Sequence, residues 1–556
     1  MRQEVNVPTT ARAAWLIPAA VAAVTLIVCI VLYAYAVVPA GPFGWDESSH
    51  AVYGLRQVQH LTRADWAAFL RENTAMSVWA FLHAWMLAAV YLIAGVGVLQ
   101  ARAFSLLCLF VFVQVLYRLT ADMAPRAGWL AGTLACAFAL TSPELLLYAG
   151  RAMLELPGLC VGWLAMCFYL RALRDQRWRA YGAAGLLAVA TFFTRYEYGL
   201  YVMATIIAVE GGRLLLALIA SASAARRRQW PMRLATTALF LLLFELAVGF
   251  WWLYDNPFRR YSIVLWEEMT HGYAPFTSAR VGMNRAWLLL HPTSMARDYT
   301  ATLAGFALIA IGSAVALTRL SDPRRVALVA LFAIGYPIVL LKYPYHPDSQ
   351  WSPFLEHARY LMMLMPVLWV LAALGLVELG SGLVPRRLRA LGVAVGALVV
   401  IVFTVGAARV FGDILRGRYT AYVTVEPTSA PYLHALRSAF DGATTPISAY
   451  LITGVSDIPP GEAEWQIRRA APSADVIVWW PPWPEVPAEG YGERLRKLVR
   501  QVRTNWIIVT EPADGAVGYA AAAADLPGVQ LVTEYAVDGR FVLKVYRRDP
   551  KVGENL

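Results

Sequence analysis

Two adjacent carboxylates follow the first long apolar stretch of the sequence. Asp46 and Glu47 lie in GPFGWDESSH (41–50), just after an apolar run over about residues 15–38. A charged side chain costs about 2.5–3.5 kcal/mol at the centre of a bilayer and less at its boundary, so acids at this position need a reason. One interpretation is a catalytic pair that contains a general base. The other is a helix N-terminus, with Asp46 as the cap and Glu47 in the first turn, and the two are compatible.

A further acid lies in the segment LYAGRAMLELPG (147–158). Arg151 and Glu155 are four residues apart, so on a helix they would share one face. The functional interpretation is an acid on the same side of the membrane as Asp46. The alternative is a structural ion pair at the start of a helix, worth a few tenths of a kcal/mol.

The third group is cationic and lies between residues 342 and 366. Lys342 is the only lysine before residue 497, and it precedes His357 and Arg359 in EHARYLMMLMP (356–366). Cations gathered in one loop indicate an anion-binding site. Ordinary anchoring of a helix at the membrane interface would use the same residue types.

These groups share a location outside the apolar runs. A pore or carrier would place polar residues at the middle of its spans, whereas Glu245 is the main ionisable residue well inside one here. The charged residues therefore indicate chemistry at a membrane surface rather than transport through the bilayer.

The composition indicates the elements that must position these residues. The 556-residue chain is 59% hydrophobic and 15% charged, whereas soluble proteins are roughly 45–50% apolar and about 25% charged. We therefore predict a polytopic α-helical membrane protein with about 11–13 membrane helices. The five cysteines all fall in apolar stretches and form no metal-binding or disulfide pattern. The net charge of +11 is distributed over loops, so it reports topology and does not indicate a nucleic-acid partner.

The basic loops predict which side each connection faces. They alternate along the chain, which places them and the N-terminus in the cytoplasm if the run over 76–99 is re-entrant or interfacial, leaving about eleven spans. The opposite face then receives four outer loops, the short turn over 195–197 and the C-terminal region. The basic loops hold Arg118, Arg126, Arg171, Arg174, Arg177, Arg179, Arg226, Arg227, Arg228, Arg233, Arg319, Arg324, Arg325, Arg386, Arg387 and Arg389, and the outer loops are 39–102, 148–155, 255–299 and 342–358.

The C-terminal region differs in pattern from the rest of the chain. It carries four short β-branched and aromatic runs, ISAYLITGV (447–455), ADVIVWW (474–480), NWIIVTEP (505–512) and GRFVLKVYRR (539–548), with helical stretches such as 489–503 between them. This alternation predicts a small extracytoplasmic α/β domain. We therefore divide the chain into a membrane domain over 1–411 and an α/β domain over 412–556.

The order and sidedness of these features resemble the type C membrane glycosyltransferases that use polyprenyl-phosphate sugars, in the branch of aminoarabinose transferases and protein mannosyltransferases. The resemblance covers the whole membrane part and ends in an outer α/β domain. It rests on an acidic pair after the first span, a Tyr-Ala…Arg…acid turn, and an Arg-Tyr-Leu…Pro start of a late span, which are Asp46 and Glu47; Tyr148, Ala149, Arg151 and Glu155; and Arg359, Tyr360, Leu361 and Pro366.

The resemblance implies inverting transfer of a sugar from a polyprenyl phosphate at the outer face of a bacterial inner membrane. The acceptor would be a lipid, a glycan or a protein, and no metal or other cofactor would be required. Asp46 would act as general base, with Glu47 and Glu155 as further catalytic acids. Cations would bind the donor phosphate and other polar groups the substrate; these are Arg359, Lys342 and Arg151 for the phosphate, and His50, His83, Tyr360 and His357 for the substrate.

One family feature is missing from the first outer loop. Many relatives carry a basic residue and two prolines there, whereas AMSVWAFLHAWML (75–87) has His83 but no proline pair. Two other functions stay open at this point. One is a transporter or lipid flippase, and the other is a non-catalytic membrane assembly protein in which the acids only cap helices.

Overall fold

The computed structural model places the described residues in two compact units. The described residues are 11–75, 79–124, 127–219, 230–249, 292–342, 358–382, 389–419, 429–440, 447–453, 460–479, 504–512, 518–537 and 541–549. The first unit, here the membrane unit, comprises Met1–Val37, Asn73–His83 and Arg102–Tyr419. The second, the loop–tail unit, comprises Val38–Glu72, Ala84–Ala101 and Thr420–Leu556. The compact units do not follow the predicted boundary, because part of the first outer loop groups with the C-terminal region. The predicted domains over 1–411 and 412–556 stay a prediction.

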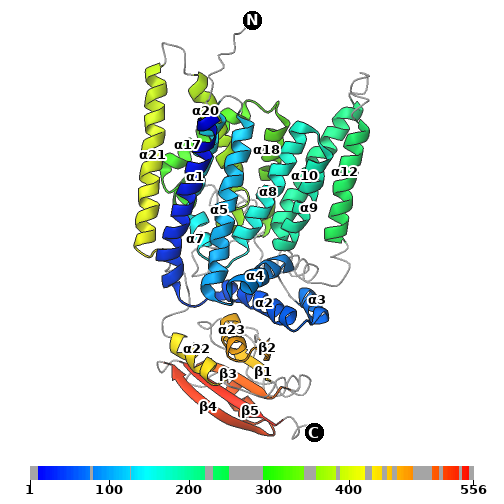
Figure 1. The fold of residues 1–556 in the computed structure, drawn as a ribbon, viewed down its shortest axis with the longest axis vertical. Helices are drawn as coiled ribbons and strands as arrows, with labels where there is room; N and C mark the ends of the chain where they lie inside the picture. The colour runs from blue at the N-terminus through cyan, green and yellow to red at the C-terminus, as the bar shows by residue number, and fades with distance from the viewer. Residues whose placement is uncertain are drawn as a thin grey trace, which may run out of the picture. The chain divides into compact units, whose positions relative to one another are not determined.

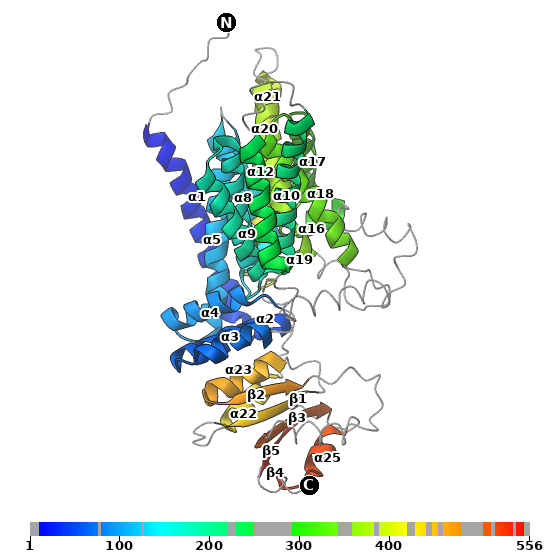
Figure 2. The same ribbon diagram turned by 90° about the vertical axis from the view of Figure 1, so that its right-hand side faces the viewer.

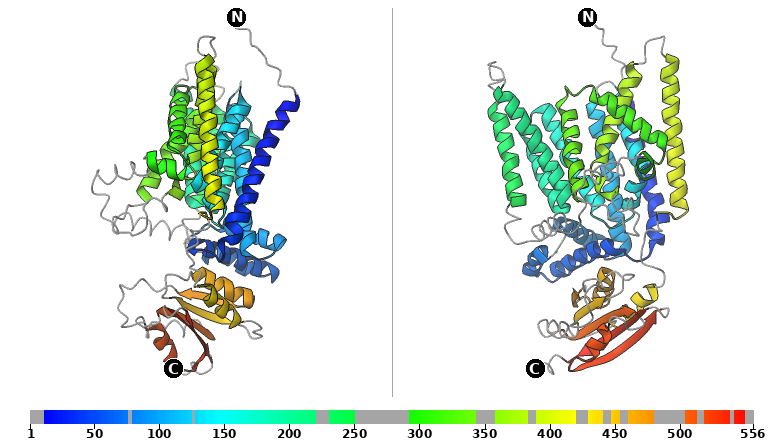
Figure 3. Two further views of the ribbon diagram at one scale, coloured as in Figure 1. Left: turned by 90° about the vertical axis from the view of Figure 1, so that its left-hand side faces the viewer. Right: turned by 180° about the vertical axis from the view of Figure 1, so that it is seen from behind.

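The membrane unit is a bundle of apolar helices that run side by side (Figures 1 and 3). The long apolar stretches of the described residues form helices. The elements are α1 (Ala11–Leu32), the π-helical turn η1 (Tyr33–Val37), α5 (Val98–Met123), α6 (Gly128–Leu140), α7 (Pro143–Ala149), α8 (Glu155–Asp175), α9 (Trp178–Thr194), α10 (Tyr196–Ile219), α12 (Trp230–Phe244), η3 (Glu245–Gly249), α16 (Pro292–Asp298), α17 (Leu303–Leu317), α18 (Pro323–Lys342), α19 (Ala358–Leu361), α20 (Met365–Gly382) and α21 (Arg389–Leu415).

Several of these helices are long and apolar enough to cross a bilayer. Five meet both criteria among the described residues, and a sixth span results if the bent pair α6 and α7 is counted as one. In hydrocarbon all backbone polar groups must bond within the segment, so apolar helices of this length are the expected solution. The chain is therefore a multi-pass membrane protein, and the predicted number of spans stays a prediction.

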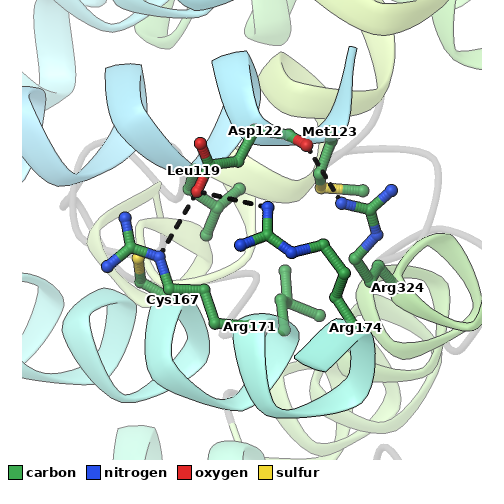
Figure 4. Close-up of a pocket in the computed structure, with 8 residues that line it drawn as sticks. Leu119, Asp122, Met123, Cys167, Arg171, Arg174 and Arg324 are labelled. Carbon is green, nitrogen blue, oxygen red and sulfur yellow. Dashed lines mark hydrogen bonds and ion pairs between the residues drawn. The ribbon is translucent and has the colours of Figure 1, made fainter. Parts of the chain in front are cut away.

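One end of the membrane unit gathers basic loops, as the charge pattern predicts. At the C-terminal ends of α5 and α8 and the start of α18, three arginines surround Asp122 at a small surface hollow (Figure 4). Arg171 Nε lies 3.3 Å from Asp122 Oδ2, and Arg324 Nη1 donates to the Asp122 carbonyl at 3.0 Å. Since α8 begins at Glu155 and ends here, Glu155 lies at the other end of the unit, roughly 30 Å away along the helix.

In the loop–tail unit, the C-terminal region forms the predicted α/β domain. Its helices and strands are α22 (Ser429–Ser438), β1 (Ser448–Thr453), α23 (Pro460–Ala470), β2 (Asp475–Trp479), β3 (Trp506–Pro512), α25 (Tyr519–Ala524), β4 (Val529–Val537) and β5 (Phe541–Arg548). The sheet order is β2-β1-β3-β5-β4, with β1 parallel to β2 and β3, and β5 antiparallel to β3 and β4. The four predicted strands are confirmed as β1, β2, β3 and β5, β4 is additional, and the predicted helix over 489–503 lies outside the described residues.

Alternation along β3 divides the core of this domain into two layers. Ile508 packs with α22 and α23 on one face of the sheet. Ile507 and Val509 pack with α25 on the other face (Figure 2). Successive side chains of a strand point to opposite faces, which is why one β-branched run supplies both layers.

The rest of the loop–tail unit comes from the first outer loop. It contains α2 (Trp45–Thr62), α3 (Trp66–Ala75) and α4 (Phe81–Ala94), and α2 packs against α23. The helix α4 occupies the run over 76–99 that the charge pattern assigns to a re-entrant or interfacial element. Its 14 residues are shorter than a bilayer span.

A buried ion network joins α2 to α23. Arg56 donates to both carboxylate oxygens of Glu464, each at 2.7 Å, and to Glu72 of α3 at 2.9 Å. Arg468 Nε donates to Glu464 Oε1, the oxygen that also accepts from Arg56 Nε, at 2.5 Å. Charges taken out of water need such complete pairing, so this network fixes how α2 and α3 lie against α23.

We expect the loop–tail unit to lose stability in acid through Glu72. Burial raises the pKa of this carboxyl, but His60, whose Nε2 lies 3.7 Å away, and the charge and hydrogen bond of Arg56 outweigh it and lower the pKa from 4.5 to about 2. A lowered pKa stabilises the fold above the unfolded value of 4.5, and that stability is lost as the pH falls towards 2. The loss is on the order of 3 kcal/mol. Thermal unfolding measured from pH 6 to pH 2 tests this. Glu72→Gln should be less stable at pH 6 and less sensitive to acid, and an equal acid sensitivity in the variant would contradict it.

Candidate active site

The helix break between α6 and α7 places polar residues inside an apolar bundle. The two helices meet at an angle of 70°, and Ser142 caps α7 by accepting a hydrogen bond from the Leu145 backbone N–H. After α7 the chain passes through a short bend over Arg151–Leu154 and begins α8 at Glu155. Polar groups on residues 144–155 therefore lie at helix ends, where carboxylates also interact favourably with the dipole of a following helix.

Glu155 is held by an arginine at the junction of α9 and α10. Its side chain is 2% exposed, and its Oε1 lies 2.5 Å from Nη1 of Arg195. Arg195 Nε lies 3.6 Å from Glu197 Oε2, and its guanidinium lies 4.5 Å from the centre of the Tyr198 ring. Arg151 precedes α8 in the bend, so the expectation that it shares a helical face with Glu155 is wrong.

A glycine allows α8 to approach this junction. A Cβ atom at Gly158 would lie 3.0 Å from the Tyr198 ring and 3.2 Å from Cβ of Arg195. A side chain at this position would require Tyr198 and Arg195 to shift by a few tenths of an ångström. The contact of α8 with α10 thus depends on the absence of a side chain one turn after Glu155.

The predicted Arg359-Tyr360 pair joins the same cluster from α19. Arg359 Nη2 donates to the Tyr360 hydroxyl at 2.9 Å, and the Arg359 carbonyl accepts from the Tyr198 hydroxyl at 3.1 Å. Arg195 lies 5.5 Å from the Tyr360 ring centre, so its guanidinium contacts the rings of both Tyr198 and Tyr360. Further along, Trp163 Nε1 of α8 donates to the Met363 carbonyl at 3.1 Å, which fixes the turn between α19 and α20.

Glu144 is a member of the cluster that sequence reasoning missed. It is 3% exposed, and among the described residues its Oε1 has no hydrogen-bond partner. It interacts electrostatically with Asp298 and Glu155 and with the guanidinium groups of Arg151 and Arg359. A buried carboxylate oxygen without a protein partner is costly, so it indicates a ligand group or water at this position. The one available signal was an acid directly after Pro143, at the start of a helix.

The buried Glu155–Arg195 pair yields a stability prediction. Removing one partner of a buried pair typically costs 3–5 kcal/mol, because the other charge keeps its desolvation cost. We therefore expect Glu155→Gln and Arg195→Gln each to lower the unfolding free energy by about that amount, and the double variant by less than the sum. Arg319→Gln is the matched control, since Arg319 is 65% exposed and pairs with Glu378 at 3.6 Å. Thermal unfolding in detergent measures all four, and additive single effects would contradict the coupling.

The structure brings four of the predicted site residues together in the membrane unit. Arg151 stacks against Tyr148 with its guanidinium 5.6 Å from the ring centre, and it interacts with Glu144, as Arg359 does. With Glu155 and Tyr360 these residues form one cluster from α7, α8 and α19. These residues come from distant parts of the sequence and converge in the structure, while the role of each stays a prediction.

Of the three other predicted residues of this part of the chain, only His83 is fully described. His83 is buried at the start of α4, with its ring centre 6.4 Å from that of Phe104 in α5. Lys342 is the last residue of α18, and its side chain lies outside the described residues. His357 also lies outside them.

The remaining predicted residues lie on the first turns of α2, in the loop–tail unit. The helix cap is Gly44, whose backbone N–H donates to Glu47 Oε2 at 3.0 Å. The side chain that caps this helix end is therefore Glu47 rather than Asp46. Asp46 is half-buried at the second position of the helix. His50 follows one turn later and is 2% exposed. The catalytic and substrate-binding roles of these three residues stay predictions.

Comparison with known proteins gives one family match in the sequence. The dolichyl-phosphate-mannose-protein mannosyltransferase family matches residues 79–251, which include His83, Arg151, Glu155 and Arg195. Asp46 and Arg359 lie outside the matched segment. No curated protein sequence matches the chain.

Solved structures resemble the chain over nearly its whole length. ArnT from Cupriavidus metallidurans, solved bound to undecaprenyl phosphate, is 16% identical with a TM-score of 0.55, covering 96% of this chain and 98% of ArnT. The archaeal oligosaccharyltransferase AglB from Archaeoglobus fulgidus, in complex with an inhibitory peptide and a dolichol-phosphate, is 12% identical with a TM-score of 0.53, covering 97% and 75%. The mycobacterial arabinofuranosyltransferase AftD is 16% identical with a TM-score of 0.53, covering 97% of this chain and 40% of AftD. The predicted resemblance is thereby confirmed: the chain has the fold of the type C membrane glycosyltransferases and carries the mannosyltransferase family pattern over residues 79–251.

Proposed function

We propose that the protein transfers a sugar from a polyprenyl phosphate to an acceptor at the outer face of a bacterial inner membrane. The observation that carries the proposal is the buried cluster of Arg195, Arg359, Glu155 and Glu144 with its tyrosines inside an apolar helix bundle. Such a cluster suits a ligand with a charged head and an apolar chain. Structures of proteins with this fold contain undecaprenyl phosphate and dolichol-phosphate, which have that character.

The two ends of α8 support an orientation in which the cluster faces outward. The basic hollow around Asp122 lies at the C-terminal end, and basic loops face the cytoplasm in membrane proteins. Glu155 begins the same helix, so the cluster would face the exterior. In this arrangement the donor headgroup lies in the outer leaflet.

Guanidinium groups would bind the donor phosphate. Arginine remains charged at all physiological pH values and binds phosphate through two parallel hydrogen bonds. Arg359 and Arg151 supply such groups, and Lys342 at the end of α18 adds a third cation. Glu155 would act indirectly by fixing Arg195, and Glu144 Oε1 would accept a hydrogen bond from a sugar hydroxyl.

Asp46 would serve as the general base in a single displacement. It takes the proton of the acceptor hydroxyl or amine while the acceptor atom bonds to the anomeric carbon. The bond from that carbon to the phosphate oxygen breaks at the same time, through an oxocarbenium-like state, and its electron pair leaves with the polyprenyl phosphate. Attack from the face opposite the phosphate inverts the anomeric configuration. The cations stabilise the charge that develops on the leaving phosphate.

Two measurements test this function. Lipid extracts from a strain that lacks the protein should accumulate a polyprenyl-linked sugar, which mass spectrometry identifies. The purified protein should then transfer that sugar, in the presence of EDTA, to an acceptor fraction from the same strain, and NMR of the product should show the inverted anomer. The proposal fails if no lipid-linked sugar accumulates and none is consumed by the purified protein.

A further inference from the structure

The start of α2 is fixed by a buried carboxylate of α23. Glu462 is fully buried, and its Oε2 accepts a hydrogen bond from the Phe43 backbone N–H at 3.2 Å. Its Oε1 accepts from Gln466 Nε2 at 2.6 Å, which holds the carboxylate in place. A residue of the C-terminal region therefore fixes the backbone three residues before Asp46.

Aromatic packing also fixes the side chain of Phe43. The Phe43 ring is fully buried and meets the Trp465 ring edge-on, with ring centres 5.1 Å apart and planes at 86°. Trp465 also lies 5.8 Å from the ring of Tyr91 in α4. The backbone and the side chain of Phe43 are thus both held by one turn of α23.

The first turns of α2 and α23 also approach each other closely. A Cβ atom at Gly461 would lie 2.6 Å from Ser48 Oγ and 2.8 Å from the Ser49 backbone N. These distances are shorter than any van der Waals contact, so only glycine permits the approach. Ser48 and Ser49 follow Asp46 and Glu47 directly, which means that α23 contacts the chain on both sides of the acidic pair.

We propose that α23 is a positioning element for Asp46, in which Glu462 and Trp465 hold the proposed base in its reactive orientation. The inference rests on the proposed function of Asp46. Displacement of a catalytic group by about 1 Å can cost 10²-fold in rate. The C-terminal domain would thereby contribute to catalysis without contacting the substrate, and Glu462 is a positioning residue rather than a catalytic one.

Two substitutions of Glu462 test the inference. We expect Glu462→Ala to lower kcat about 10- to 100-fold and to leave the KM for the donor unchanged, since the proposed phosphate ligands lie in the membrane unit. Glu462→Gln retains an oxygen that accepts from the Phe43 N–H, so it should recover most of the rate. If Glu462→Ala does not fold, Gly461→Ala makes the same test, because the added Cβ displaces the first turn of α2.

Ile508→Ala is the matched control. Ile508 is fully buried in the core that α23 shares with the sheet, so its truncation destabilises the domain through packing alone. We expect it to lower the unfolding temperature and to preserve kcat below that temperature. A rate for Glu462→Ala that falls only in proportion to the loss of folded protein would overturn the positioning role.

A double variant separates this inference from the function on which it rests. In the Asp46→Asn background, adding Glu462→Ala should cause no further loss of rate, because the group being positioned is already gone. If Asp46→Asn is inactive and Glu462→Ala is fully active, the positioning role is overturned and the proposed function stands. If Asp46→Asn is fully active, the proposed base is wrong and Glu462 has no base to position.

Discussion

We expect Asp46→Asn to lower kcat for the proposed sugar transfer about 10²–10⁴-fold. The amide has nearly the same shape as the carboxylate, but it cannot accept the proton of the acceptor. The Gly44 N–H donates to Glu47 Oε2, so the substitution keeps this cap of α2. Transfer measured with labelled donor, beside thermal unfolding of the same preparation, separates lost chemistry from lost folding.

Asp65→Asn is the matched control in the same loop. Asp65 is exposed, and its Oδ1 accepts from the Ala68 backbone N–H at 2.9 Å at the start of α3. Asparagine caps helices as well as aspartate does, so this variant should keep full stability and full activity. Full activity in Asp46→Asn as well would show that the general base lies elsewhere.

Arg359→Gln should be the second most damaging change, lowering kcat about 10²–10³-fold. Its guanidinium lies beside the Tyr360 hydroxyl and interacts with the buried Glu144, where the charge of a leaving phosphate can be stabilised without water. Arg359→Lys keeps the charge but loses the planar pair of donors, so it should recover only part of the rate. Single-turnover transfer at saturating donor measures both variants.

Arg118→Gln is the control for Arg359. Arg118 is an exposed arginine of α5, close to the end of the unit that carries Asp122. Its loss removes the same charge from the membrane unit without changing the cluster, so kcat should stay within about twofold of wild type. Equal losses in Arg118→Gln and Arg359→Gln would indicate a general effect of net charge and would contradict a specific phosphate ligand.

Much of the fold could be predicted from the sequence because the bilayer restricts what an apolar run can form. The helices α8 and α10, for example, coincide with apolar stretches of the sequence that are long enough to cross a bilayer. In the C-terminal domain, continuous β-branched runs predict the buried strands. The strand β4 was not predicted, because it lies at the edge of the sheet. There Leu531 and Val532 are about half exposed, and polar residues interrupt the apolar run.

The site was predictable only where residue types stand out locally. Arg151, Glu155, Arg359 and Tyr360 lie in loops or at helix ends and form one cluster, as their positions suggest. The pairing of Glu155 with Arg195 depends on how α8 packs against α10, and the burial of Glu144 depends on the 70° break before α7. Neither is encoded in the spacing of residues along one segment.

The pairing of α2 with α23 also has a consequence for biosynthesis. Trp45–Thr62 leaves the ribosome about 400 residues before Pro460–Ala470, which at 5–20 residues per second is a delay on the order of tens of seconds. During that time α23 has not yet been made, so it cannot cover Phe43 or pair with Arg56. A nascent chain that stalls before α23 would expose both residues to chaperones and proteases. Packing of the start of α2 is therefore expected to wait until α23 has been synthesised.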